Sequence, residues 1–306
     1  MERKPKLCSN NRTQNAAFTE RPESLASLAV RAMLRHRSGM VGLVILLFLT
    51  VIAVLAPVLA PYDPLEMNSA ARFQPPSPSY PFGADEFGRD ILSRVVVGSR
   101  LSFQVGAVSV GIAFVVGVTL GLVTGWAAGS WLDTVSMRIC DAILAFPAVL
   151  LAIVIMAVLG PGALNAMLAV AVVNIPAFAR LTRGNVLSEK EKTYVEAARS
   201  IGASPARILF RGILPNVMPT VLVHITVAFA SAVLLEASLS FLGLGTPLPA
   251  PSWGSMLSIG RGYLLIAPWY AIAPGLAITL LVMGAYLVGD GLRDVLDPRR
   301  QKLAGA

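Results

Sequence analysis

The segment from Glu189 to Pro215, EKEKTYVEAARSIGASPARILFRGILP, separates two long apolar runs of the chain. Its apolar positions follow the i, i+3, i+4, i+7 spacing of one narrow helix face, and they are Tyr194, Ala197, Ala198 and Ile201. Charged residues elsewhere on this helix stand at spacings that predict Lys192–Glu196 and Glu196–Arg199 pairs. We therefore expect a polar helical insert between membrane spans, suited to docking a partner protein on the inner side of a membrane.

Gly202 divides this insert into two helices. Glycine takes the left-handed conformation that closes a helix, and Ser204 and Pro205 follow it as an N-cap and a first helical residue. Pro215 and Pro219 are expected to mark the point where the second helix gives way to the next span. The alternatives are a polar helix-turn-helix without a partner and a DNA-binding element. DNA binding is disfavoured because spans tether the segment at both ends.

Composition places most of the chain in a membrane. Of the 306 residues, 55% are hydrophobic and 14% are charged, and the mean hydropathy is +0.70. The apolar residues stand in uninterrupted runs, so the net charge of +8 has to be assigned loop by loop and is no indication of nucleic-acid binding. Cys8 and Cys140 lie far apart and predict neither a disulfide framework nor a metal site.

Six runs are long enough to cross a hydrocarbon core of about 30 Å. They predict spans near 39–59, 101–126, 142–159 with a kink at Pro147, 163–178, 217–241 and 269–288. Two GxxxG pairs, Gly117–Gly121 and Gly121–Gly125, indicate close helix packing. We expect a short loop to carry Asp133, Arg138 and Asp141.

The polar loop at 62–100 has a second half, 81–94, that predicts a glycine-bounded turn followed by an interfacial amphipathic helix. Its charges alternate in sign, which favours a local ion-pair network over a contact with solute; they are Asp85, Arg89, Asp90 and Arg94.

The distribution of lysine and arginine predicts the orientation. With both termini on the inner side, the inner segments carry 20 of the 25 Lys and Arg residues and the outer segments carry 5. Cationic loops are retained in the cytoplasm, so this asymmetry predicts cytoplasmic termini and a cytoplasmic 189–215 segment. Residues 24–37 predict either an amphipathic helix lying on anionic membrane lipid or a solvated tail.

Few residues suggest chemistry. The sequence has no GxxxxGK[ST] motif, so it predicts no ATP site in this chain. With two histidines and no paired catalytic groups, no enzyme activity, cofactor or metal is expected. Glu236 stands near the outer end of a span, where an ionisable group suggests either a functional role or a structural hydrogen-bond acceptor. Trp253 follows a proline-rich turn that we expect to shape an outer gate.

Four segments together resemble the C-type permease subunit of ABC importers of the dipeptide, oligopeptide and nickel type. They are Glu196-Ala197-Ala198 with Gly202 and the Leu214-Pro215 ending, then FGADEFGRDILSR at 82–94, EASLSFLGLG at 236–245, and DGLRDVLDPR at 290–299. Gly212 stands where that family most often has isoleucine.

The resemblance implies an all-α type I permease fold of six transmembrane helices in a bacterial inner membrane. It also implies an ATPase-coupling loop at 189–215, with contact residues Glu196, Ala197, Ala198, Gly202, Ser204, Pro205, Leu214 and Pro215. The implied partners are a second homologous permease, two ABC ATP-binding subunits that hydrolyse the ATP, an extracytoplasmic solute-binding protein and a peptide-like solute.

The expected division of the chain is a basic tail at 1–37, a first span with its outer loop at 38–100, a transmembrane domain at 101–290 and a tail at 291–306. A nickel or glutathione importer of the same family remains an alternative. From another class, an ATP-independent secondary transporter is the alternative, although the spans are nearly free of charge and show no repeat. Gly202→Asp is expected to leave insertion intact and to uncouple uptake from ATP hydrolysis.

Overall fold

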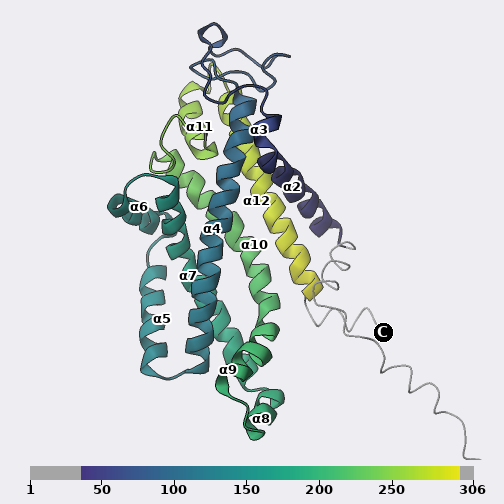
Figure 1. Cartoon of the computed structure of the whole chain (residues 1–306). Helices are drawn as coiled ribbons and strands as arrows, with labels where there is room; N and C mark the ends of the chain where they lie inside the picture. Colours follow the sequence, from purple (N-terminus) through teal and green to yellow (C-terminus); the bar gives the residue numbers. More distant parts are fainter. Residues whose placement is uncertain (1–35, 297–306) are drawn as a thin grey trace, which may run out of the picture.

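Long helices run side by side along one axis of the molecule (Figure 1). The computed structural model describes residues 36–296, so the basic N-terminal tail and the end of the C-terminal tail lie almost entirely outside the described residues. Within 36–296 there is no strand, and the only β-pairing is an isolated bridge between Ala84 and Asp90. The expectation of an all-α protein is confirmed.

Five helical segments in the described residues are long and apolar enough to cross a membrane. They are α2 (Arg37–Val54), α4 (Ile91–Trp126), α7 (Ala163–Lys190), the continuous segment Pro205–Phe241 and α12 (Trp269–Leu296). A sixth crossing is formed if α5 (Trp131–Leu144) and α6 (Ala148–Leu159) count as one broken span, since they are bent by 97°. The predicted number of six holds in that form.

The short elements gather at the two ends of the bundle. One end carries α8 (Thr193–Ser200) and α9 (Pro205–Arg207) (Figure 1). The other end carries α3 (Ala56–Leu59), η2 (Ser69–Ala71), α11 (Trp253–Gly260) and η4 (Arg261–Tyr263). The 189–215 segment and the 62–90 loop therefore lie at opposite ends, as the predicted topology requires.

Several predicted boundaries are wrong. The second span begins at Ile91 instead of Leu101, because the expected interfacial helix is the first part of α4. At 36 residues α4 is roughly 54 Å long, well beyond a hydrocarbon core of about 30 Å. Its N-terminal turns are capped by Asp90 and held by the outer loop, so a buried protein environment replaces lipid there.

The expected short loop at 133–141 is a helix. Asp133, Arg138 and Asp141 all lie within α5, and the span predicted to begin near Ala142 with a mild kink is broken over Ala145–Pro147. Ser130 caps α5 by accepting a hydrogen bond from the Asp133 amide at 3.2 Å. Hydropathy predicted a loop here because the segment is charged. In the structure Arg183 and Arg180 of α7 form ion pairs with Asp133 and Asp141, so the charges are compatible with a packed helix.

Helices α4 and α7 share the most extensive contact in the described structure. The two predicted GxxxG pairs lie on this seam. A Cβ atom on Gly117, Gly121 or Gly125 would stand 2.5–2.7 Å from atoms of α7. The absence of side chains therefore allows the backbones of the two helices to approach closely.

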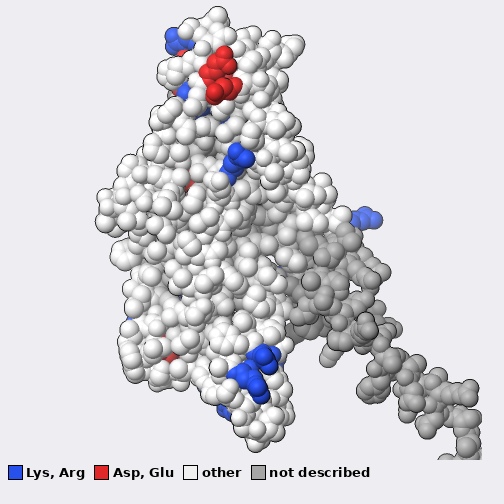
Figure 2. All heavy atoms as spheres, viewed as in Figure 1, with Lys and Arg blue, Asp and Glu red and all other residues white. Residues whose placement is uncertain are grey.

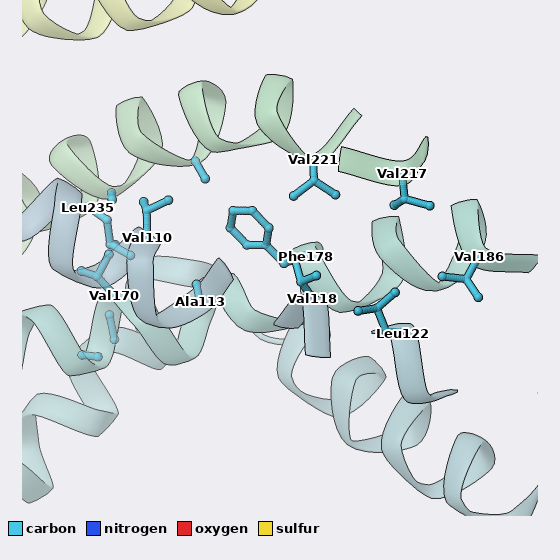
Figure 3. Close-up of a cluster of buried hydrophobic side chains, with 14 of the residues drawn as sticks. Val110, Ala113, Val118, Leu122, Val170, Phe178, Val186, Val217, Val221 and Leu235 are labelled. Atoms are coloured by element: carbon cyan, nitrogen blue, oxygen red, sulfur yellow. The ribbon is translucent and has the colours of Figure 1, made fainter. Parts of the chain in front are cut away.

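The central hydrophobic cluster lies between α4, α7 and α10 (Leu214–Phe241). Figure 3 shows the Phe178 ring of α7 in the space between α4 and α10, with Val118 of α4 near its base. The same cluster continues to Val195 of α8, which is fully buried. The core of the membrane bundle thus reaches the short helix of the 189–215 segment.

The outer loop holds the ion-pair network that its alternating charges predicted. Asp85 accepts a hydrogen bond from Arg89 Nε at 2.6 Å, and Arg94 Nε lies 3.7 Å from the same carboxylate. All three side chains are buried. Removing Asp85 would break the buried contact with Arg94 and leave Arg89 with Glu86 alone, at 3.3 Å. Breaking a buried ion pair by removing one partner costs about 3–5 kcal/mol. The network therefore fixes the fold of the loop.

Candidate functional site

The 189–215 segment forms an elbow, defined here as α8, the turn at Ile201–Ser204 and α9. Gly202 has φ +77°, in the left-handed region that favours glycine, so the predicted helix stop is confirmed. Its amide donates to the Arg199 carbonyl at 2.9 Å, and the Ala203 amide donates to the Ala198 carbonyl at 3.0 Å. Ser204 caps α9 by accepting from the Arg207 amide at 3.4 Å, and Pro205 is its first residue.

The elbow turns its small-residue face to solvent. Ile201 is 84% exposed, and the exposed set also includes Glu196, Ala197, Gly202, Ser204, Pro205 and Pro215. Ala198 and Leu214 are half-buried, and a Cβ atom on Gly202 would meet nothing within 4 Å. Ile201 alone would be an ordinary exposed apolar residue, but it lies next to the exposed small-residue face, which makes this face a candidate for docking.

The charge pairs predicted on α8 are wrong. Lys192 forms its ion pair with Glu189 instead of Glu196, and Arg199 stacks over the Trp126 ring at 5.1 Å from its centroid. The reason is that α7 runs on to Lys190, twelve residues past the predicted end of its span. It brings Glu189 next to α8, and the end of α4 brings Trp126.

Sequence reasoning placed Tyr194 on the apolar face of the helix and missed that it holds the elbow to the bundle together with Glu189 and Asn216. Tyr194 donates from its hydroxyl to Glu189 Oε2 at 2.8 Å, and it accepts from the Asn216 amide at 3.3 Å. Burial, together with the neighbouring Glu189 carboxylate, holds the pKa of the Tyr194 phenol above its usual range, so the hydroxyl stays a donor at neutral pH. Hydropathy gave no signal for these contacts, because they join residues from three different helices.

The predicted break at Pro215 and Pro219 is absent. The chain continues as helix from Pro205 to Phe241, through a π-helical stretch, η3 (Ile208–Ile213), into α10. Pro215 follows η3 directly, and because proline has no amide hydrogen it donates no backbone hydrogen bond to that stretch. The elbow is thus joined rigidly to one span, α10, through its C-terminal arm.

Charge is distributed unevenly along the molecule. Figure 2 shows a broad, mostly uncharged band across the middle of the visible face and a group of Lys and Arg atoms at the end that carries the elbow. Within the described residues no group of three or more His, Cys, Asp or Glu side chains could hold a metal ion.

The other two candidate residues lie toward the opposite end. Glu236 of α10 is 1% exposed, and its Oε1 accepts from the Ser240 hydroxyl at 2.6 Å. Trp253 of α11 is equally buried and donates from its indole nitrogen to the Val95 carbonyl of α4 at 2.9 Å. They are not part of the elbow. Trp253 joins α11 to α4.

Comparison with known proteins identifies the family. A family model described as the binding-protein-dependent transport system inner membrane component matches residues 117–302, more than half of the chain. The chain belongs to this family. A second model, the N-terminal TM domain of oligopeptide transport permease C, matches residues 24–76 of the permease.

Curated relatives cover nearly all of this permease. The dipeptide transport system permease protein DppC of Alkalihalophilus pseudofirmus is 45% identical over 271 residues, 89% of each chain. The glutathione transport system permease protein GsiD of Pectobacterium atrosepticum is 46% identical over 270 residues, 88% of this permease and 89% of GsiD. DppC of Haemophilus influenzae is 42% identical over 271 residues, 87% of this permease and 92% of the relative.

A solved structure supports the fold. An inward-facing MetNI methionine ABC transporter chain matches with a TM-score of 0.54 and 24% identity, covering 67% of this permease and 97% of that chain. The predicted fold, an ABC importer permease of the inner membrane, is therefore confirmed. The permease is a transport component and not an enzyme, and its family disfavours the ATP-independent secondary transporter.

Proposed function

We propose that this permease carries a peptide-like solute across the inner membrane and is driven at its elbow by separate ATPases. A second homologous permease completes the pathway, two ABC ATP-binding subunits supply the energy, and an extracytoplasmic solute-binding protein delivers the solute. The choice of a peptide-like solute is supported by the relatives described above, which are dipeptide and glutathione transport permeases of similar length.

One observation carries the docking site: the elbow presents an exposed small-residue face while its opposite side is joined to the core. Ile201 is 84% exposed and Val195 is fully buried, although they are six residues apart on the same short segment. A partner that seats on the exposed face can move the elbow, and the buried side passes that movement to the spans. Closure of the ATPases then switches the pathway from inward-facing to outward-facing.

Orientation and domain organisation complete the proposal. The elbow and both termini are placed in the cytoplasm, as the distribution of Lys and Arg predicts. Residues 38–100 form the peptide-permease segment with its outer loop, and residues 101–290 form the transmembrane domain. Glu236 and Trp253 support the outer end of the pathway.

Cross-linking tests the docking site. In a variant with Cys8 and Cys140 replaced by serine, Ala197→Cys is expected to cross-link to the ATP-binding subunit in the assembled transporter, because Ala197 lies on the exposed face of α8. Leu265→Cys is the matched control, since Leu265 is fully exposed but lies at the opposite end of the bundle. A cross-link from Leu265→Cys and none from Ala197→Cys would contradict the proposal.

The glutathione relative gives a second candidate solute, since its identity to this permease is 46% against 45% for the dipeptide relative. Calorimetry of the cognate solute-binding protein with dipeptides, glutathione and a nickel complex separates these candidates. We expect dipeptides to bind, and binding of glutathione alone would replace the peptide assignment.

A further inference from the structure

Tyr194 joins three helices at the base of the elbow. The side-chain amide of Asn216 donates a hydrogen bond from Nδ2 to the Tyr194 hydroxyl at 3.3 Å, and that hydroxyl donates to Glu189 Oε2 at 2.8 Å. Glu189 lies in the last turn of α7, Tyr194 in the first turn of α8 and Asn216 in the first turn of α10. One phenol thus connects the elbow to two spans that reach deep into the bundle.

The surroundings hold this phenol in one place. Lys192 pairs with the other oxygen of the Glu189 carboxylate, which leaves Oε2 for the Tyr194 hydroxyl. The Asn216 amide also donates to the Gly212 carbonyl at 3.0 Å, so its orientation is fixed from both sides. A Cβ atom on Gly212 would stand 3.5 Å from the Tyr194 ring, an ordinary van der Waals distance, so the ring lies directly beside η3.

A short helix needs such a connection. With eight residues, α8 is too short to be stable alone in water and depends on tertiary contacts. Its other contacts with the bundle include the burial of Val195, the packing of Ala198 against the core and the stacking of Arg199 on Trp126. Burial of Val195 is not directional, and Arg199 stacks over the half-buried Trp126 ring without a hydrogen bond. The hydrogen-bond chain through Tyr194 is the directional contact among them.

We propose that Tyr194 is a positioning residue that transmits movement of the elbow to α7 and α10 together. This inference rests on the proposed function, because it requires an ATPase to displace the elbow. Without the hydroxyl, α10 would still follow the elbow through its covalent connection at η3. Helix α7 would likewise stay joined to α8 through Glu191 and Lys192. The elbow would lose only the side-chain bonds that hold the end of α7 and the start of α10 to the same phenol, so we expect the two spans to respond to the elbow separately.

The test uses the complete transporter, with its second permease, ATP-binding subunits and solute-binding protein, in proteoliposomes. The measured quantity is solute imported per ATP hydrolysed. Tyr194→Phe removes the hydroxyl and keeps the ring, and it is expected to lower this ratio about 3- to 10-fold, the range set by losing one hydrogen bond. Tyr286→Phe on α12, whose hydroxyl lies outside this chain of bonds, is the control and is expected to keep the wild-type ratio.

Asn216→Ala tests the other bond of the chain. It is also expected to lower the ratio, and the double variant with Tyr194→Phe should lose no more than the larger single effect, because both remove one connection. Asn185→Ala is its matched control, since the Asn185 amide bonds the Leu181 carbonyl of its own helix at 3.0 Å. If Tyr194→Phe fails to assemble, the same criterion is applied to Asn216→Ala, whose side chain is exposed.

The outcomes separate this inference from the proposed function. If Ala197→Cys still cross-links to the ATPase and Tyr194→Phe imports as much solute per ATP as the wild type, the role of Tyr194 is overturned. If Tyr194→Phe does not assemble, an unchanged ratio in Asn216→Ala has the same meaning. If Ala197→Cys gives no cross-link in a chain that keeps Tyr194 and Asn216, the proposed docking site is overturned. The inference about Tyr194 is then overturned too, because it depends on that site. A merely structural role would lower the amount of assembled transporter and leave the ratio of the remaining complexes unchanged.

Discussion

At the scale of single residues, Gly202 shows how one backbone conformation shapes the candidate site. Its φ of +77° closes α8, and the space where a side chain would project is empty. Substitution is therefore restricted by the backbone and not by neighbours within this chain. Any further restriction must come from a surface that approaches from outside.

Two substitutions at Gly202 distinguish these effects. Asparagine and aspartate have similar shapes and both tolerate the left-handed region better than other side chains. We expect Gly202→Asn to retain most uptake and Gly202→Asp to lose much more, because a carboxylate would be placed against the docked ATPase. Uptake and ATP hydrolysis are measured on equal amounts of inserted protein. Equal uptake by the two variants would argue against a close contact at this position.

At the scale of elements, the seam between α4 and α7 depends on glycines on one helix face. A Cβ atom on Gly121 would lie 2.5 Å from the Ala179 carbonyl oxygen and 2.6 Å from Thr182 Cβ. Rigid backbone lies on one side of this contact, so it cannot adjust as the end of a flexible side chain can. Close approach of α4 and α7 also brings Asp133 within 2.7 Å of Arg183, which ties α5 to the same seam.

Gly121→Leu tests this seam. Overpacking of a well-filled core costs about 1–3 kcal/mol, so we expect the variant to unfold at a lower temperature in detergent and to insert poorly. Gly111→Leu on the same helix is the matched control, because a Cβ atom there meets nothing within 4 Å. Thermal unfolding of the two purified variants gives the comparison, and similar losses in both would show that leucine disturbs α4 wherever it is placed.

At the scale of the whole molecule, the two ends of the bundle differ in construction. One end is a folded outer loop held by buried ion pairs, with Trp269 of α12 reaching the Ala84 carbonyl at 3.5 Å. The other end carries the elbow and exposed Lys and Arg (Figure 2). The end with the elbow is the one that the distribution of Lys and Arg predicts to be cytoplasmic.

Cysteine labelling tests this orientation. In the background without native cysteines, Leu265→Cys is expected to react with a membrane-impermeant maleimide in intact spheroplasts, because it is fully exposed at the end that carries the outer loop. Ile201→Cys, which is 84% exposed, is expected to react only in inverted vesicles prepared from cells without the ATP-binding subunits. The reverse pattern would exclude a cytoplasmic elbow.

Local sequence features were sufficient for some parts of this protein. Uninterrupted apolar runs predicted helices in a membrane, since every backbone polar group has to be satisfied within the segment there. Gly202, Ser204 and Pro205 predicted the elbow, because their conformational preferences act within a few residues. The alternating charges after Pro81 likewise predicted the ion pairs of the outer loop.

Tertiary structure alone decided the rest. The hydropathy pattern predicted that the span of α7 ends at Phe178 and that Asp133 lies in a loop. In the structure Asp133 pairs with Arg183 of α7, and this pairing allows the charged helix α5 to form beside the contact between α4 and α7. The partners of α8 are Glu189, Trp126 and Asn216, from three helices, and no spacing along one helix indicates them. The amino-acid sequence by itself determined that the apolar runs are helical and where the elbow turns. Only long-range contacts decided how the elbow is attached to the spans, because those contacts form after the helices have packed.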